Sequence, residues 1–409
     1  MSLPFFFARR YFLSKRKKNF INVISGLSMV GVTFATAALI IVLSVFNGIG
    51  ELLRSLYAAF DPPLKVVVTT GKSFEFTDSL RQKISAVPGI GIVTEVIEDH
   101  VYVRNRAGDT EAEMVVTMKA VSDNFADHHR IDDHIVSGKF QLHQGDIPGV
   151  VVGSGVRNTL SVAVENNVIP MQLYYVRNPS AGLTDPSSLY HSRSVLPTGV
   201  FAIEKNFDEN YIIVPLSVGE ELLDYDGRRT SLEIKPERSV EEVRSDLRKI
   251  LGTNFEILAD DEQHRDLYRL LRIEKVFTFL ALALLVIIAS INIYFSLMML
   301  VIDKKKDISV LHAMGASPSL IRSIFFSESF LISGIGTLVG LLGGAFLCYL
   351  QQTIGLVGMG MENAVVSNYP IQMQWPDFVL VLTLNALVTL LISWYPARAA
   401  GRSWTPELL

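Results

Sequence analysis

The chain has 409 residues, of which 49% are hydrophobic and 19% are charged, and its formal net charge is −4. It is too long for one average domain, and its positive mean hydropathy excludes an ordinary soluble enzyme. The single cysteine, Cys348, excludes a fold held together by disulfides within the chain.

The apolar residues gather in four blocks, each long enough to cross the hydrocarbon core of a bilayer as a helix. The blocks cover residues 23–46, 276–302, 330–350 and 378–395, and with their flanks they predict transmembrane helices at 21–48, 271–302, 320–351 and 376–396. The first block is longer than the apolar region of a signal peptide, and no convincing small-x-small cleavage site follows Phe46. We therefore expect an uncleaved anchor.

Basic residues next to these blocks predict the orientation, because Lys and Arg are retained on the cytoplasmic side. They precede the first block (Arg9, Arg10, Lys15, Arg16, Lys17, Lys18), follow the second (Lys304, Lys305, Lys306) and follow the fourth (Arg398, Arg402). Residues 352–375 contain neither Lys nor Arg. Segments 1–20, 303–319 and 397–409 are thus expected inside, and segments 49–270 and 352–375 outside.

The segment 49–270 predicts a large α+β domain inserted between the first two membrane helices. Its two ends repeat a strand, helix, strand pattern, at 64–70, 78–87 and 92–103 and again at 231–235, 240–251 and 255–258. In the later helix, Ser239 and Glu242 have capping-box spacing and Gly252 can close the end. Its predicted apolar face comprises Val240, Val243, Leu247 and Ile250. Residues 121–200 predict a more irregular, strand-rich insert, with a Pro/Ser-rich stretch at 178–188.

Both connections between this domain and the membrane predict helices that continue beyond the bilayer. Ile49, Leu52, Leu53, Leu56 and Phe60 repeat at helical spacing, and Leu267, Leu270, Leu271 and Val276 do the same before the second block. Pro62 and Pro63 are expected to stop the first of these helices. The two extensions would form a stalk suited to passing movement across the membrane.

Two candidate ligand sites in the external segment each have a simpler interpretation. Gly71, Lys72 and Ser73 resemble the end of a phosphate-binding loop, but Val66 stands where that motif needs a glycine, so we expect a turn. The run 127–134 holds His128, His129, His134, Asp127, Asp132 and Asp133, which could bind a metal, but a solvated loop is favoured. No GxSxG, HExxH or CxxC motif is present, so neither a catalytic nor a metal site is predicted.

Within the third block, Gly336, Gly340 and Gly344 lie on one helix face, where another helix can approach closely. Packing inside the chain and a subunit interface are equally compatible with this spacing. Glu328, Asn292 and Asn385 are polar residues in or next to the blocks, and hydrogen bonding between helices is the favoured explanation.

The segment 304–319 predicts a short cytoplasmic helix between the second and third membrane helices. Ile308, Leu311 and residues 313–316 form its small apolar face, and Gly315 and Pro318 end it. Such a helix is too small to act alone, so docking into a groove of a partner is expected, with a plain connecting loop as the alternative.

This segment resembles the coupling helix of ABC permeases of the FtsX/MacB type. Asp307 matches the usual acidic position, Gly315, Ala316 and Ser317 match the small-residue turn, and Glu328 matches the acidic residue that opens the third membrane helix. Pro396, Ala397, Arg398 and Ala399 match the terminal motif, whereas His312 stands where Arg or Lys is usual. Residues 5–49 and 289–308 are similar to the LolC/LolE type almost throughout. Residues 149–162 resemble a family segment as well, with Asn166 and Asn167 where Gly-Asp is commoner.

The resemblance implies a non-catalytic permease subunit in a bacterial inner membrane, with an FtsX-like permease domain over about 271–409. It implies a second permease, identical or related, and two cytoplasmic ATPase subunits that bind ATP and Mg, so this chain needs no cofactor of its own. Lipoproteins would be the cargo and a periplasmic carrier the recipient, and no nucleic-acid partner is expected. The resemblance also implies which residues couple this chain to the ATPase: Lys306, Asp307, Ile308, Leu311, His312, Met314, Gly315 and Ala316. Cargo would enter along Leu39, Ile40, Val42, Leu43 and Phe46.

Three alternatives stay open from the sequence. A MacB-type exporter of another cargo is the nearest, although such chains usually carry a fused ATPase. An FtsX-type signalling protein that regulates a cell-wall hydrolase is the second, although its external domains are generally smaller. A membrane-anchored enzyme is the third, and it lacks a catalytic constellation.

Overall fold

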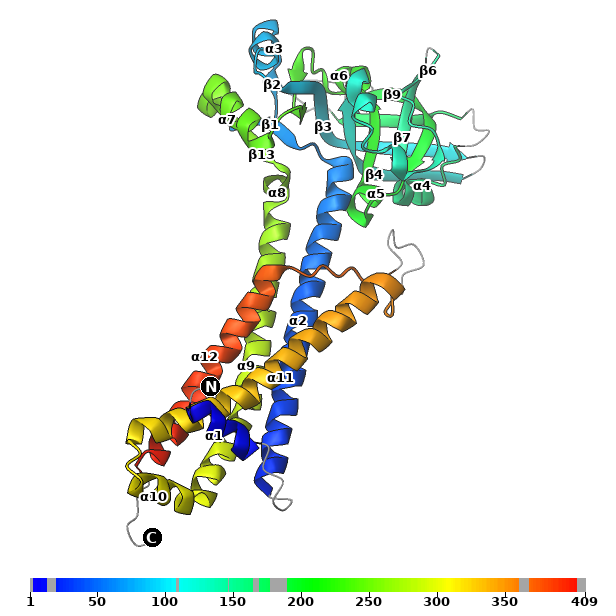
Figure 1. Cartoon of the computed structure of the whole chain (residues 1–409). Helices are drawn as coiled ribbons and strands as arrows, with labels where there is room; N and C mark the ends of the chain where they lie inside the picture. The colour runs from blue at the N-terminus through cyan, green and yellow to red at the C-terminus, as the bar shows by residue number, and fades with distance from the viewer. Residues whose placement is uncertain are drawn as a thin grey trace. The chain divides into compact units, whose positions relative to one another are not determined.

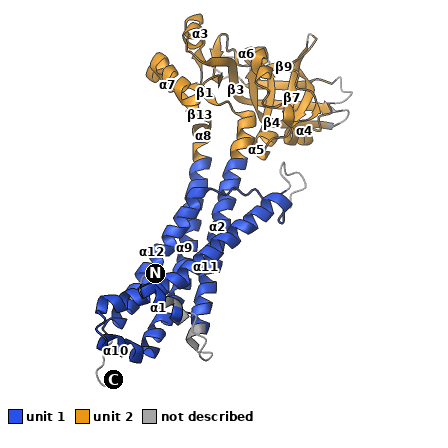
Figure 2. Cartoon of the chain, in the orientation of Figure 1, with its two compact units in different colours: residues 1–52, 267–409 blue, residues 53–266 orange. Residues whose placement is uncertain are grey.

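The computed structural model describes residues 3–12, 20–107, 110–145, 147–164, 169–176, 190–359 and 368–402. These residues form two compact units, Met1–Leu52 with Leu267–Leu409 and Leu53–Asp266 (Figure 2). Four features that the sequence analysis uses lie outside the described residues: the basic run 15–18, Asn166 with Asn167, the stretch 178–188 and the ending 403–409.

The first unit is helical (Figure 1). Its helices are α1 (Leu3–Phe12), the part of α2 (Phe20–Phe60) up to Leu52, the part of α9 (Arg265–Asp303) from Leu267, α10 (Lys305–Ala313), α11 (Pro318–Ile354) and α12 (Trp375–Ala400). Among the described residues, four helices are long and apolar enough to cross a membrane, at 23–60, 265–303, 318–354 and 375–400. This agrees with the four predicted apolar helices, and α2 and α9 continue through the helical extensions that the spacing predicts.

Local chemistry explains where these helices begin and end. Pro62 and Pro63 follow the last residue of α2, where their rings block a further helical turn. The Ser317 hydroxyl accepts a hydrogen bond from the backbone N–H of Leu320, and Pro318 occupies the first turn of α11. Gly355 ends α11 with φ of +68°, a left-handed conformation that favours glycine.

The second unit is built on one large sheet with the strand order β13-β1-β12-β3-β4-β10-β7-β9-β5. Its long strands are β3 (Ile90–Ala107), β4 (Thr110–Val121), β7 (Ile147–Gly153) and β9 (Tyr190–Phe201). The shorter ones are β1 (Leu64–Val68), β5 (Ile135–Gly138), β6 (His143–Gln144), β8 (Met171–Val176), β10 (Tyr211–Pro215), β12 (Ser231–Pro236) and β13 (Phe255–Ala259). β2 (Phe74–Glu75) and β11 (Arg228–Arg229) form a separate pair.

The two ends of this unit pair with each other, as the repeated pattern predicts. β1 lies antiparallel to both β12 and β13, so Leu64 faces Ile234 on one side and Ala259 on the other. Helices α3 (Asp78–Ser85) and α7 (Val240–Leu251) cover this part and share its apolar core through Ile84, Val243 and Leu247. The α+β prediction is therefore confirmed for this unit.

The predicted irregular insert is more regular than expected. β8 pairs with both β3 and β9, so the pairings β3-β4-β10-β7-β9-β8 close into a ring. Its apolar core also takes side chains from α4 (Ser154–Leu160) and α6 (Leu216–Leu223), and α5 (Lys205–Asn210) precedes β10. Closure depends on pairing between strands far apart in the chain, which no local pattern reports.

Two details of α7 differ from the prediction. Ser239 precedes the helix, but its side chain forms no capping hydrogen bond within the described structure. Ile250 is exposed and Leu251 is buried, because the buried face continues at a spacing of four from Val243 through Leu247. Gly252 follows the helix with φ of +68°, as expected for a closing glycine.

Candidate functional site

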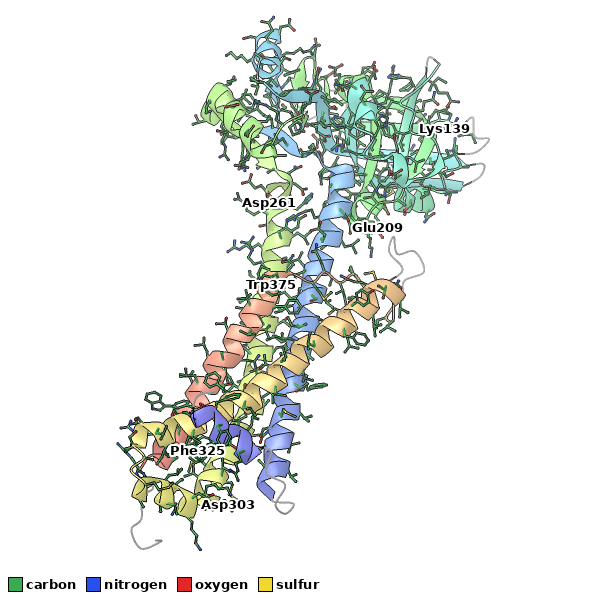
Figure 3. All side chains as sticks on the ribbon, in the orientation of Figure 1. Lys139, Glu209, Asp261, Asp303, Phe325 and Trp375 are labelled. Carbon is green, nitrogen blue, oxygen red and sulfur yellow. The ribbon has the colours of Figure 1, made fainter. Side chains whose placement is uncertain are left out.

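The segment between α9 and α11 folds as a separate short helix. α9 ends at Asp303, and α10 begins two residues later at Lys305 (Figure 3). The Ser309 hydroxyl donates to the carbonyl of Lys305, inside the helix. Gly315 has φ of +90°, and the backbone N–H of Ala316 donates to the carbonyl of Leu311 as the chain turns toward α11. Figure 1 shows α10 at one end of the helical unit.

The two faces of α10 have different surroundings. Ile308 is buried in an apolar cluster with Ile321 and Phe325 of α11, so it anchors the helix to its own unit. Val310 and Met314 are exposed, at 48% and 71%. Their four-residue spacing places both side chains on one face, which makes them the apolar surface that α10 presents.

This arrangement corrects the predicted apolar face. Ile308 cannot present a side chain to a partner while α10 is packed as described, and Leu311, His312 and Ala316 are half-buried. Lys306, Asp307, Met314 and Gly315 are exposed, and Asp307 lies 3.7 Å from the ammonium of Lys304. Val310 was missed, although its spacing from Met314 could have indicated it.

The glycines of α11 pack against α2. A side chain at Gly340 would place its Cβ 2.6 Å from the carbonyl oxygen of Thr33, and one at Gly344 would place it 2.9 Å from Ile40. At Gly336 the Cβ would lie 2.9 Å from the carbonyl oxygen of Met29. Of the two alternatives left open by the sequence, the structure shows packing inside the chain.

Three pairs of polar side chains connect the long helices. Asn385 of α12 accepts a hydrogen bond from Thr36 of α2 at 3.5 Å. Hydroxyl pairs join Ser333 to Thr389 at 2.6 Å and Ser25 to Ser296 at 2.5 Å. Hydrogen bonding between helices thus accounts for Asn385. It does not account for Asn292, which is exposed, or for Glu328, whose buried Oε2 has no partner within the described residues.

The predicted cargo wall is largely part of the protein's own core. Leu39, Ile40 and Leu43 are at most 1% exposed and pack with Val286 of α9 and Val381 of α12. Val42 and Phe46 remain half-buried. The sequence marks all five as apolar, but it does not show which side of α2 its neighbouring helices cover.

A polar cluster missed by the sequence analysis joins α2, α9 and α12. The Asn47 amide donates to the Asp377 carboxylate at 2.6 Å, and the Lys275 ammonium donates to the Asn47 oxygen at 2.7 Å. Next to it, a Cβ at Gly48 would lie 2.3 Å from the carbonyl oxygen of Pro370. Asn47, Lys275 and Asp377 come from three distant parts of the sequence, so no local spacing predicts the cluster.

In the second unit, buried charges hold the end of α2. The Glu233 carboxylate is 0% exposed and pairs with the Lys119 ammonium at 2.7 Å and with the Arg130 guanidinium. Lys119 and Arg130 also donate to the carbonyl of Phe60, the last residue of α2, at 3.2 and 3.3 Å. Burial alone would raise the pKa of Glu233, but the two cations outweigh it and lower this pKa to about 2.

Two further bonds connect the residues after α2 to the segment before α9. The His264 ring lies 2.6 Å from the Asp61 carboxylate, and the Gln263 amide donates to the carbonyl of Pro62 at 2.8 Å. His264 and Gln263 follow β13 and flank the end of α8 (Asp260–Gln263). The residues that follow α2 and those that precede α9 are therefore bonded to each other within the second unit.

The histidine-rich run forms two short 3-10 helices, at Asp123–His128 and Asp132–His134. His129 pairs with Asp132 on the surface, whereas His128 is buried against Thr94 at 2.8 Å, so the solvated-loop prediction is wrong for His128. Across the described ranges, no group of three or more His, Cys, Asp or Glu side chains could hold a metal ion. Gly71 has φ of +98°, as the predicted turn requires.

Comparison with known proteins finds family matches for both the helical unit and the sheet-containing unit. Residues 25–250 match the MacB-like periplasmic core domain family, and residues 279–403 match the FtsX-like permease C-terminal family. The chain is 24% identical to the lipoprotein-releasing system transmembrane protein LolE of Haemophilus influenzae, over 100% of this chain and 99% of that protein. It is 22% identical to LolC of Xylella fastidiosa (98% and 97%) and 21% identical to LolC of Neisseria meningitidis (100% and 99%).

The chain therefore belongs to the ABC transporter permeases that carry a MacB-like periplasmic core domain. Within this class it is a permease of the LolC/LolE type, and the resemblance stated from its motifs is confirmed.

Proposed function

We propose that this permease uses ATP hydrolysis by a separate partner to release lipoproteins from the inner membrane to a periplasmic carrier. The observation that carries the proposal is the end-to-end similarity to LolC and LolE, each described as part of a lipoprotein-releasing system. Withdrawing acyl chains from a bilayer costs about 0.8 kcal/mol for each buried methylene, so release needs an energy source and an apolar recipient.

In this proposal the first unit spans the membrane with both termini in the cytoplasm, and the second unit lies in the periplasm. The basic residues Lys304, Lys305 and Lys306 support a cytoplasmic position for α10. The exposed pair Val310 and Met314 then faces the ATPase, with Lys306 and Asp307 beside it. Movement of α10 reaches the second unit through α2 and α9.

Cargo access is proposed at the half-buried residues of α2 only. Val42 and Phe46 retain exposed apolar surface, whereas Leu39, Ile40 and Leu43 are already covered by α9, α11 and α12. A photocrosslinking residue at Val42 or Phe46 should therefore capture lipoprotein in a complex stalled before hydrolysis. Exposed Leu382 of α12 serves as the control, and equal capture at Leu382 would argue against access along α2.

The deciding experiment depletes the permease in its own cell and follows the location of lipoproteins. We expect them to accumulate in the inner membrane and to leave it again when the chain is restored. Normal lipoprotein location together with loss of export of a peptide or toxin would instead favour the MacB-type alternative, which the core-domain match also supports.

A further inference from the structure

A pocket of about 410 Å³ lies where α11 begins and α12 ends, and neither the coupling segment nor the proposed cargo path uses it. Arg322 of α11, Arg398 of α12 and Arg402, two residues after the end of α12, line it, and Phe326 and Trp394 form an aromatic wall. Its lining contains no acidic residue among those that the structure describes. The pocket thus combines three positive charges with apolar surface.

Close packing of two helix ends creates this pocket. Gly401 has no side chain, and a Cβ there would lie 3.0 Å from the carbonyl oxygen of Pro318 and 3.1 Å from Cγ of Arg322. The ring of Phe326 meets the edge of Trp394, with centroids 6.3 Å apart. Arg322 and the aromatic wall of Phe326 and Trp394 are therefore positioned by contacts within the first unit.

Among the described residues, no acidic side chain neutralises the positive charge of the pocket. Arg322, Arg398 and Arg402 are all exposed, and within the described part of the chain no carboxylate forms an ion pair with any of them. The Nε of Arg322 donates to the carbonyl of Pro318 at 3.4 Å, so its terminal nitrogens stay available. Guanidinium groups bind phosphate oxygens through paired hydrogen bonds, which favours a phosphate-bearing anion.

The face of α12 that leads to the pocket favours a lipid over a soluble anion. Leu387, Leu391, Trp394 and Arg398 follow one another at spacings of three or four residues, so they share one side of α12. Arg402 follows two residues after the helix ends. All five are exposed, and the face changes from aliphatic to aromatic to cationic along its length. A phospholipid has the same order, from acyl chain through interface to phosphate. A soluble anion or an acidic protein segment would leave the aliphatic part unexplained.

We propose that this arginine pocket binds the phosphodiester headgroup of an anionic phospholipid, with an acyl chain along Leu387 and Leu391 of α12. Basic pockets between membrane helices on the cytoplasmic side are suited to such headgroups. The inference rests on the membrane placement under the proposed function, but it is independent of the cargo. Binding fixes a lipid beside the junction of α11 with the coupling segment.

The test measures lipid binding to the full-length chain by native mass spectrometry, with phosphatidylglycerol as the anionic probe and phosphatidylcholine as the zwitterionic one. The test variant replaces Arg322, Arg398 and Arg402 with Gln. The matched control replaces Arg265, Arg269 and Arg272 of α9, three exposed arginines outside the pocket, and so changes the charge equally. Thermal unfolding of each variant checks that it is folded, and the three single Gln variants replace the triple variant if it does not fold.

We expect phosphatidylglycerol to bind each single variant about fivefold more weakly and the triple variant about 100-fold more weakly, because each basic residue near a membrane surface contributes about 1 kcal/mol. The control should keep its affinity, and phosphatidylcholine binding should be equal in all proteins. Excess inorganic phosphate should leave the lipid bound.

Unchanged phosphatidylglycerol binding in the pocket variants, or an equal loss in the control, would overturn the proposal. Displacement by inorganic phosphate would show a soluble-anion site instead. Unchanged lipid binding with loss of ATPase copurification would assign the arginines to a protein interface. Since lipid occupancy is the readout, neither its success nor its failure depends on lipoprotein release.

Discussion

At the scale of single residues, the second unit contains buried charged side chains, whose removal from water costs free energy. Glu233 is fully buried, and it stays ionised because Lys119 and Arg130 surround it. The same two cations bind the carbonyl of Phe60, one of the final carbonyls of α2 that lack a partner within the helix. One buried carboxylate therefore positions the two side chains that hold the end of a long helix.

Replacing Glu233 with Gln should destabilise the second unit by about 3–5 kcal/mol, because two buried cations lose their counter-charge. The pKa of Glu233 falls from 4.5 to about 2 on folding, so its stabilisation is present above pH 4.5 and is lost as the pH falls toward 2. Hydrogen exchange of the strands, corrected for intrinsic rates, measures both effects. Exposed Glu237 is the control, and a Glu237→Gln change as large as that at Glu233 would refute the argument.

His128 predicts a second pH dependence in a separate range. Burial, followed by the nearby Arg130 charge, lowers its pKa from 6.5 to about 4, so the unfolded chain binds a proton that the folded chain does not. Stability should therefore fall as the pH drops from 6.5 to 4, and His128→Asn should flatten this part of the profile. Thermal unfolding of the unmodified chain and of His128→Asn across this pH range measures the slope, and equal slopes would contradict the argument.

At the scale of elements, a single helix has one closely packed face and one exposed face. α11 presents Gly336, Gly340 and Gly344 to α2, while Gly334 and Gly343 have open space around them. α10 buries Ile308 and exposes Val310 and Met314. The helical period alone identifies the faces, but only the neighbouring helices decide which face is covered.

Two alanine substitutions in α11 should have opposite effects. Gly340→Ala places a Cβ 2.6 Å from a carbonyl oxygen of α2 and should cost about 1–3 kcal/mol. Gly343→Ala meets nothing within 4 Å and should be neutral or stabilising by up to about 1 kcal/mol, because alanine favours the helix. Thermal unfolding of the two full-length variants compares them directly. Equal unfolding temperatures would mean that α2 does not pack on this stripe.

Charge on the exposed face of α10 should break the proposed ATPase contact. Val310→Asp with Met314→Asp should weaken copurification with the ATPase about tenfold or more, because apolar anchors carry most of such interfaces. Leu311 is left unchanged, since it is half-buried and its replacement would also disturb packing. Ile354→Asp with Leu356→Asp alters two exposed apolar residues at the other end of α11. If both pairs behave alike, α10 is not the contact.

At the scale of the whole molecule, single helices run through both units. α2 has 41 residues, which corresponds to about 60 Å of helix, roughly twice the thickness of a hydrocarbon core. Its outer end is bonded to the second unit through Phe60, and His264 and Gln263 bond the neighbouring Asp61 and Pro62. α2 is one continuous helix up to these bonds, which is the physical basis for proposing that force passes along it.

A flexible Gly-Ser insertion after Ile49 tests this transmission. It should leave both units folded and ATP hydrolysis intact, yet stop lipoprotein release, because the helix can no longer carry force. The same insertion after Gly71, in a turn with open space around it, is the control and should preserve release. Release that survives both insertions would exclude a lever in α2.

Much of this architecture is predictable from sequence, and the exceptions share a physical cause. The four apolar helices, the extensions to Phe60 and from Arg265, and the paired ends of the second unit all follow from local spacing. The ring closed by β8, the burial of Leu39 and Ile40, and the Asn47–Asp377 cluster depend on partners far away in the chain. Local periodicity contains no information about such partners.

The pairing of β1 with β13 has an evolutionary consequence. The chain leaves α2 and returns to α9 through neighbouring antiparallel strands, so the second unit begins and ends at adjacent points. Domains with adjacent ends can be exchanged between related proteins without altering the host that carries them. Under the proposed function, new cargo preferences could therefore be acquired by replacing this unit alone, while the long apolar helices and the proposed ATPase contact on α10 are inherited unchanged.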